Sequence, residues 1–281
     1  MSFSARAGLY CRFLSSPADC HAPKIRLAWD QMLSGSDPIG AVYRSPAWYD
    51  HMNTGDPKPP CYLAVLLDQA DEIRGIAALG IRRVPVPVTA AGRTLLTPHL
   101  RVVDIFGGQP LLAGDAESYD CLFSALAEQF PDCDGVRLAE IPVGGALSRY
   151  LDNSSVIRQR FLLCDSRGLA PYQALPLPKT YAQYLAHFAR KRRYNLRRQE
   201  RLLRQHGSGT LELKRWESPD DVGGLLRQLA LLSDRAGPAD VCGHRDARHP
   251  YAEVACRGLL RCYTLYMWRR SCGCPDGLPI R

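Results

Sequence analysis

Basic side chains that could bind an anion are concentrated in one short stretch of the chain. Residues 190–204 contain eight arginine or lysine residues and one acid, Glu200, so they hold +7 of the formal net charge of +8. A guanidinium group is a planar fork that matches a phosphate or a carboxylate. The positive charge is therefore local, and any function has to explain its position.

On a helix, five of these arginines fall within an arc of about 80°. They are the candidate substrate-binding residues: Arg190, Arg193, Arg197, Arg201 and Arg204. The other side carries apolar residues: Leu185, Phe188, Leu196 and Leu203. The pattern predicts an amphipathic helix. Like charges four residues apart repel by a few tenths of a kcal/mol per pair, and Glu200 is the one acid that relieves them.

Two interpretations of the arginines remain open. In the first, they form a solvated face and pair with acids elsewhere in the fold. In the second, they bind an anionic substrate, a nucleic acid or an anionic membrane surface. Aromatic side chains that would stack on bases are scarce, since Tyr194 is the one aromatic residue in the stretch.

The segments around the arginines predict a second domain. Thr180 is a candidate N-cap for one helix over residues 181–206, which ends at the glycines of residues 207–209. A strand over 210–216 and a leucine-rich helix over 219–233 follow, and residues 257–266 predict a further strand. Residues 166–178 are rich in proline and predict a linker.

The first 165 residues alternate between strand and helix patterns. A short apolar run at 61–67 and its partner at 73–83 predict a hairpin. Two prolines within 84–88 must sit at a sheet edge or leave the sheet. We also expect strands within 100–112 and at 136–141. Three helices are expected: one that ends near residue 33, one at 116–130 and one that starts near residue 146. The fold class is α/β (α+β), with domains at 1–165 and 179–267 and an atypical tail at 268–281.

Composition limits the class of protein further. A chain of 281 residues favours two domains, and it has no run of about 18 apolar residues that would span a membrane. The first residues lack the apolar core of a secretory signal. Eleven cysteines without an export signal indicate reduced thiols. We therefore expect a cytoplasmic protein.

Three segments carry a resemblance to a known family. They are the basic helix with its following strand and leucine-rich helix, the motif Tyr43-Arg-Ser-Pro-Ala-Trp48, and the strand 76–83, which lacks the proline usual in that family. Together they resemble the GNAT-type acyltransferases related to FemAB and to the CelD-type proteins of polysaccharide operons. The resemblance implies tandem GNAT-like halves, each a mixed sheet flanked by helices, with the second half incomplete.

The resemblance also implies a reaction. An acyl group would pass from an acyl-CoA such as acetyl-CoA, or from an aminoacyl-tRNA in FemAB relatives, to an amine acceptor, in cell-envelope or exopolysaccharide synthesis. No metal is expected. Backbone N–H groups at a helix N-terminus would hold the pyrophosphate, and a base or water would remove the amine proton. The family's pyrophosphate loop, Gln/Arg-x-x-Gly-x-Gly/Ala, is expected beyond residue 281.

The last 45 residues read differently from the rest. Our hypothesis is that residues 236–256 and 268–281 are translated out of frame and that the chain is truncated, which predicts an inactive product. The alternative is a metal site made by the cysteines and histidines of this part of the chain. Its spacings are Cys-x-His and Cys-x-Cys, whereas zinc sites favour two to four intervening residues. Its members would be Cys242, His244, His249, Cys256, Cys262, Cys272 and Cys274.

Other single residues are weaker candidates. Asp104 and Glu140 lie near predicted strand ends, where an acid could act as a base. Structural roles are expected for three isolated histidines and two tryptophans: His51, His99, His187, Trp29 and Trp48. The leading function is N-acyl transfer, and the alternative is a non-catalytic module that binds nucleic acid or an anionic surface through residues 190–204.

Overall fold

The computed structural model describes residues 8–37, 40–54, 60–90, 93–164, 177–206, 211–236 and 248–267. The chain divides into two compact units, Met1–Pro171 and Tyr172–Arg281. The border falls inside the predicted linker 166–178, of which residues 166–176 lie outside the described part.

Unit 1 is built on one mixed sheet, in the order β1-β2-β3-β6-β8, with β7 paired to β3. Neighbouring strands are antiparallel except for β6 and β8, which are parallel and joined through helix α4. The strands are β1 (Leu9–Leu14), β2 (Cys61–Asp68), β3 (Ile73–Pro85), β6 (His99–Ile105), β7 (Leu111–Leu112) and β8 (Gly135–Arg137).

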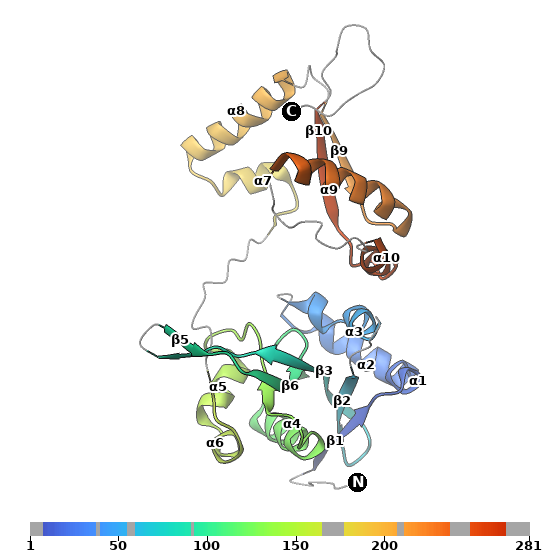
Figure 1. Ribbon diagram of the computed structural model, residues 1–281, viewed down its shortest axis with the longest axis vertical. Helices are drawn as coiled ribbons and strands as arrows, with labels where there is room; N and C mark the ends of the chain where they lie inside the picture. Colours follow the sequence, from blue (N-terminus) through green and yellow to red (C-terminus); the bar gives the residue numbers. More distant parts are fainter. Residues whose placement is uncertain are drawn as a thin grey trace. The chain divides into compact units, whose positions relative to one another are not determined.

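Helices cover both faces of this sheet (Figure 1). One face packs on α4, α5 and α6, and the other packs on α2 and α3. This is why residues 63–67 of β2 are buried without interruption, because successive side chains enter opposite cores. The helices of unit 1 are α1 (Pro17–Cys20), α2 (Pro23–Ser34), α3 (Pro46–Met52), α4 (Ala116–Gln129), α5 (Ala146–Asn153) and α6 (Ser155–Arg160), with a 3₁₀ turn, η1 (Ala41–Arg44).

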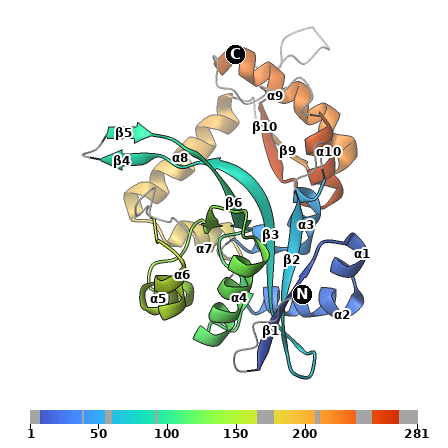
Figure 2. The ribbon, with the colours of Figure 1, turned by 60° about the horizontal axis from the view of Figure 1, so that its bottom comes forward.

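The prolines of residues 84–88 mark where the chain leaves the main sheet. Beyond Pro85 the strands continue as a separate pair, β4 (Val88–Ala90) and β5 (Arg93–Leu96). Figure 2 shows this pair as an arm that projects beyond the helices of unit 1. Pro85 is the last residue of β3 and Pro87 lies beyond it, so the prediction that these prolines sit at a sheet edge or leave the sheet is confirmed.

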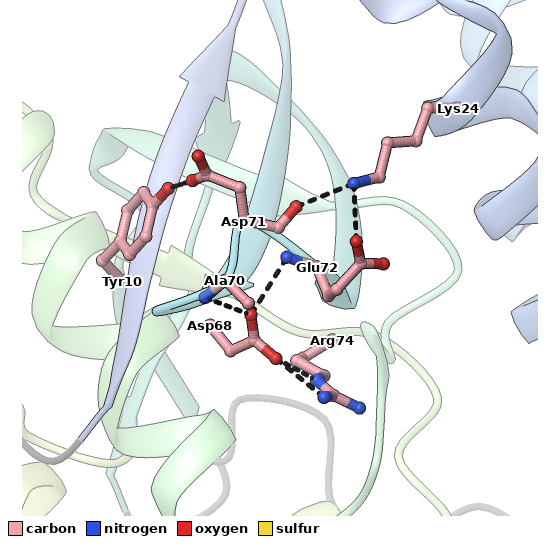
Figure 3. A network of polar contacts seen from close by, with 7 residues as sticks. All are labelled: Tyr10, Lys24, Asp68, Ala70, Asp71, Glu72 and Arg74. Atoms are coloured by element: carbon pink, nitrogen blue, oxygen red, sulfur yellow. Dashed lines mark hydrogen bonds and ion pairs between the residues drawn. The ribbon is translucent and has the colours of Figure 1, made fainter.

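The turn between β2 and β3 is held by the carboxylate of Asp68 (Figure 3). Its Oδ1 accepts hydrogen bonds from the backbone N–H groups of Ala70 and Glu72, at 2.9 and 3.0 Å, and its Oδ2 pairs with Arg74. Lys24 of α2 pairs with Glu72 and also donates to the carbonyl of Asp71. These contacts stabilise the turn internally and also attach it to α2.

Unit 2 contains a two-stranded antiparallel sheet and a small core. Trp216, Val222, Leu225, Ala255 and Leu260 are buried together. Two helices contribute to this core, while the other face of the sheet exposes leucine and tyrosine side chains. The elements are α7 (Tyr181–Ala186), α8 (Arg190–His206), β9 (Leu211–Trp216), η2 (Pro219–Asp221), α9 (Val222–Ala236), α10 (Arg248–Cys256) and β10 (Cys262–Met267).

Most predicted elements are present, but three need correction. The predicted helix 181–206 is two helices. The predicted strand 136–141 is only Gly135–Arg137, because Glu140 takes a left-handed conformation at φ 57° that a strand cannot contain. The strand expected at 257–266 starts at Cys262, after a turn through Gly258 at φ 67°.

Candidate functional site

The basic helix α8 begins at Arg190, after a break that the sequence did not reveal. His187 and Phe188 donate their backbone N–H groups to carbonyls three residues earlier, which closes α7. The Phe188 ring packs edge-on against Tyr184 at 5.0 Å, and the Arg192 guanidinium lies 5.0 Å from the centre of the Phe188 ring. A new helix then starts with the bond from Arg193 N–H to the Ala189 carbonyl. Thr180 caps α7 as predicted, through a capping box with Gln183.

All five predicted binding arginines lie on α8, so their arc of about 80° belongs to one continuous helix. Arg193 is half-buried and the other four are exposed. Lys191 and Arg198 widen the basic surface to an arc of about 160°. We call Arg190, Arg193, Arg197, Arg201 and Arg204 the arginine stripe.

One member of the arginine stripe has an acid partner in the part of the chain that the structure describes. Arg204 pairs with Glu200 at 3.1 Å. For the guanidinium groups of Arg190, Arg193, Arg197 and Arg201 the described residues provide no ion pair or hydrogen bond. Within these residues, the interpretation that the stripe pairs with acids elsewhere in the fold therefore finds no support.

The apolar side of α8 is not a packed face among the described residues. No side chain of the helix is buried, and Leu202 and Leu203 are 36% and 39% exposed. Leu185, which the prediction placed on the same face, is buried, but it belongs to α7. The predicted apolar side is therefore not one face of a single helix: Leu185 lies on α7, Phe188 lies in the break, and Leu196 and Leu203 lie on α8.

A family-type glycine pattern does occur near the arginine stripe, at residues 204–209, which read Arg-Gln-His-Gly-Ser-Gly. It follows the C-terminal end of α8 and precedes β9. A helix C-terminus presents carbonyl oxygens, whereas a pyrophosphate needs the N–H groups of a helix N-terminus. The pattern therefore lacks the strand-loop-helix order that would let it hold a pyrophosphate.

Unit 1 has a second group of charges, where β6 and β8 end. Asp104 of β6 is buried and contacts Arg82 of β3 and Arg137 of β8, the latter with Nη1 at 3.1 Å from Oδ1. Burial raises the pKa of Asp104, and the two guanidinium groups act against that rise. The sequence placed Asp104 near a strand end but gave no sign of its two partners.

The remaining candidates do not gather at either place. His51 is half-buried in α3 beside Trp48, His99 is exposed at the start of β6, and His187 caps α7. Trp29 is buried and donates from Nε1 to the Arg44 carbonyl at 2.8 Å, which confirms its predicted place in the core.

Of the cysteines and histidines proposed for a metal site, four lie outside the described residues: Cys242, His244, Cys272 and Cys274. Cys256 and Cys262 are free thiols. Among the described residues no three His, Cys, Asp or Glu side chains are grouped so that they could hold a metal ion. None of the helices in the described ranges combines the length and the apolar character that a membrane-spanning segment requires.

The fold defines a mixed α/β protein, with a mixed sheet flanked by helices. No family model matches the chain, and no curated protein matches it. A crystal structure of a mutant of the BH1408 protein from Bacillus halodurans is similar over 59% of this chain and 99% of that chain, at 13% identity and a TM-score of 0.35. A superposition of that quality supports no functional conclusion.

Proposed function

We propose that the chain is an N-acyltransferase of the GNAT type, related to the FemAB-like and CelD-like proteins, and that the arginine stripe binds the phosphates of its acyl-CoA donor. The acceptor would be an amine. The observation that carries the proposal is that four exposed or half-exposed arginines on one side of α8 have no acid partner among the described residues.

The charge of α8 supports binding of a multiply charged anion. Each guanidinium offers five N–H donors, and a phosphate accepts two of them side by side. An anion between neighbouring arginines would also relieve their mutual repulsion. The mixed sheet of unit 1, flanked by helices, is compatible with a GNAT-like half.

Helix α4 of unit 1 is a poor alternative site for the donor. Its first turn is already capped by the carboxylate of Asp115, which accepts from the backbone N–H of Ser118 at 2.7 Å. Glu117 adds a second negative charge there. A pyrophosphate would be repelled from this helix N-terminus, which favours α8 as the place where the donor binds.

The test is calorimetric titration of the full chain with acetyl-CoA. Replacing Arg193, Arg197 and Arg201 by Gln should lower the affinity by at least tenfold. A matched control replaces Arg12, Arg83 and Arg93, three exposed arginines of unit 1, and removes the same charge. Equal affinity in the two triple variants would contradict the proposal. Transfer of a labelled acetyl group to a panel of amines would then test catalysis.

A single-stranded nucleic acid is the second candidate, and the length of the stripe favours it. From Arg190 to Arg204 the helix rises about 21 Å. A strand stacked as it is in a duplex, with one phosphate per about 3.4 Å of axis, would place about six phosphates beside it, whereas CoA has three phosphate groups. Two results together would establish this alternative. Binding of the nucleic acid would weaken steeply with salt, and less steeply in the α8 triple variant, while acetyl-CoA would give no response.

A further inference from the structure

Three neighbouring strands of unit 1 each place one charged residue on the same face of the sheet. Asp104 of β6 lies opposite Arg137 in the parallel pairing with β8, and opposite Gly80 in the antiparallel pairing with β3. Arg82 lies two residues beyond Gly80, on the same face. Gly80 has no side chain, so Arg82 can reach Asp104 diagonally.

The cluster has a buried end and an exposed end. The Asp104 side chain is 6% exposed, whereas those of Arg82 and Arg137 are 43% and 31% exposed. The carboxylate therefore lies in the sheet, and the two guanidinium groups reach from it toward solvent. Asp104 fixes both arginines, so an incoming ligand would not have to order them.

The charges do not balance within the cluster. One guanidinium is enough to neutralise Asp104, and the second leaves a surplus positive charge. Among the described residues, the charged groups that act on Asp104 are these two arginines. Each has N–H donors beyond the contacts to Asp104, and these donors can bind an anion at the exposed end.

The position in the sheet also suits a ligand. Asp104 and Arg137 lie at the carboxyl ends of β6 and β8, where the pairing changes from antiparallel to parallel. Arg82 and Arg137 therefore reach Asp104 from the two strands that flank β6. The Phe106 ring packs against Gly80 and so bounds the cluster on one side, since a Cβ at Gly80 would lie 3.0 Å from that ring.

We propose that Arg82 and Arg137, fixed by Asp104, form a clamp that binds one oxyanion group, a carboxylate or a phosphoryl group. The clamp lies in unit 1 and does not depend on the arginine stripe or on acyl transfer. A ligand held there would be oriented by two guanidinium groups from strands on either side of β6.

The experiment uses the full chain with Arg193, Arg197 and Arg201 replaced by Gln, which weakens anion binding at α8, and the readout is taken at unit 1 alone. The protein is labelled with ¹⁵N-glycine, and the amide resonances of Gly80, Gly107 and Gly108 are followed during separate titrations with inorganic phosphate and with succinate. We expect a saturable shift at Gly80. Saturation by phosphate alone identifies a phosphoryl site, and saturation by succinate alone identifies a carboxylate site.

Substitutions separate a clamp from a structural ion cluster. Arg82→Lys and Arg137→Lys keep a positive charge beside Asp104 but lose the planar fork, so each should lower the affinity by at least tenfold. Arg83→Gln is the control, because Arg83 is the next residue of β3 and lies on the other face. If neither anion shifts Gly80, or if both lysine variants bind as well as the control, the cluster is structural only and the proposal is wrong.

Discussion

Gly108 and Gly144 both have positive φ, at 69° and 72°, but their surroundings differ completely. A Cβ on Gly108 would lie 1.5 Å from the carbonyl oxygen of Ala139, while a Cβ on Gly144 would meet nothing within 4 Å. Gly108 thus lets the turn after β6 approach the segment that follows β8. A substitution at Gly144 would therefore cost only backbone strain, whereas a substitution at Gly108 would add a steric clash to that strain.

Gly144→Ala should lower the free energy of unfolding of unit 1 by about 1–2 kcal/mol, the cost of a left-handed alanine. Gly108→Ala should lower it by more, or prevent unit 1 from folding, because the backbone of residue 139 has to move. Urea unfolding of both variants measures the difference. Equal losses would show that the turn shifts away from Ala139 at no cost.

The carboxylate of Asp68 predicts a pH-dependent stability. The backbone N–H of Glu72 and then the guanidinium of Arg74 lower the pKa of Asp68. A lowered folded pKa gives stability that is present above the unfolded value of about 3.9 and is lost as the pH falls through the folded value. Asp68→Asn should therefore melt earlier than the wild type at pH 7, and the difference should shrink toward pH 3.

Asp152→Asn is the control for this melting experiment, since Asp152 is exposed and makes no ion pair among the described residues. Its melting temperature should follow that of the wild type at every pH. A difference between Asp68→Asn and the wild type that stays constant from pH 7 to pH 3 would contradict the role of the charge.

At the scale of residues, sequence predicts best what depends on near neighbours. Thr180 could be recognised as an N-cap because its partner Gln183 is three residues away. The partners of Asp104, by contrast, are 22 and 33 residues away, and only the strand register brings them together. The place of Glu140 near a predicted strand end makes it a candidate base, but its left-handed backbone does not follow from its residue type.

At the scale of elements, α8 predicts opposite effects for two neutralising substitutions. Arg197 lies four residues from both Arg193 and Arg201 and three residues from Glu200, so Arg197→Gln removes two repulsive pairs and one attractive pair. It should stabilise unit 2 by a net of about 0.2–0.5 kcal/mol. Glu200→Gln breaks the pair with Arg204 and should destabilise it by a similar amount. Helix propensity changes little in either case.

Urea unfolding at low salt measures both effects. In 1 M salt both differences should disappear, because the Debye length falls to about 3 Å. A loss of stability in Arg197→Gln at either salt concentration would mean that this guanidinium makes a stabilising contact, and it would weaken the case for a free arginine stripe.

The elements also show where periodicity stops being informative. The apolar spacing of α4 continues over the whole helix, and the residues at that spacing are buried: Tyr119, Leu122, Phe123 and Leu126. The pattern over residues 181–206 continues through a break, since Phe188 packs on Tyr184 instead of continuing the helix. A helical wheel drawn over residues 181–206 therefore places side chains of α7 and α8 on one shared face, although the two helices are not continuous.

At the scale of the whole molecule, the two units have separate cores and should unfold separately. Leu122 is buried among fifteen residues of one core in unit 1, and Leu225 among five in unit 2, counted over the described residues. Leu122→Ala should lower the stability of unit 1 alone, and Leu225→Ala that of unit 2 alone, each by about 2–5 kcal/mol.

Differential scanning calorimetry of the full chain checks this prediction. We expect two transitions, of which unit 2, with the smaller core, melts first. A single transition that both variants shift together would show that the units unfold as one. The division into two halves followed from the proline-rich segment and the change of pattern around it, but neither could show how unequal the two cores are.

The short strand β8 has a kinetic consequence. It is an edge strand of three residues, held beside β6 by a parallel pairing. Short edge strands open locally at a lower free energy than the central strands do. Each opening would carry Arg137 away from Asp104, while Arg82 could remain in place. Amide hydrogen exchange at residues 135–137 should therefore be faster than in β2, and an anion bound to both arginines should slow it.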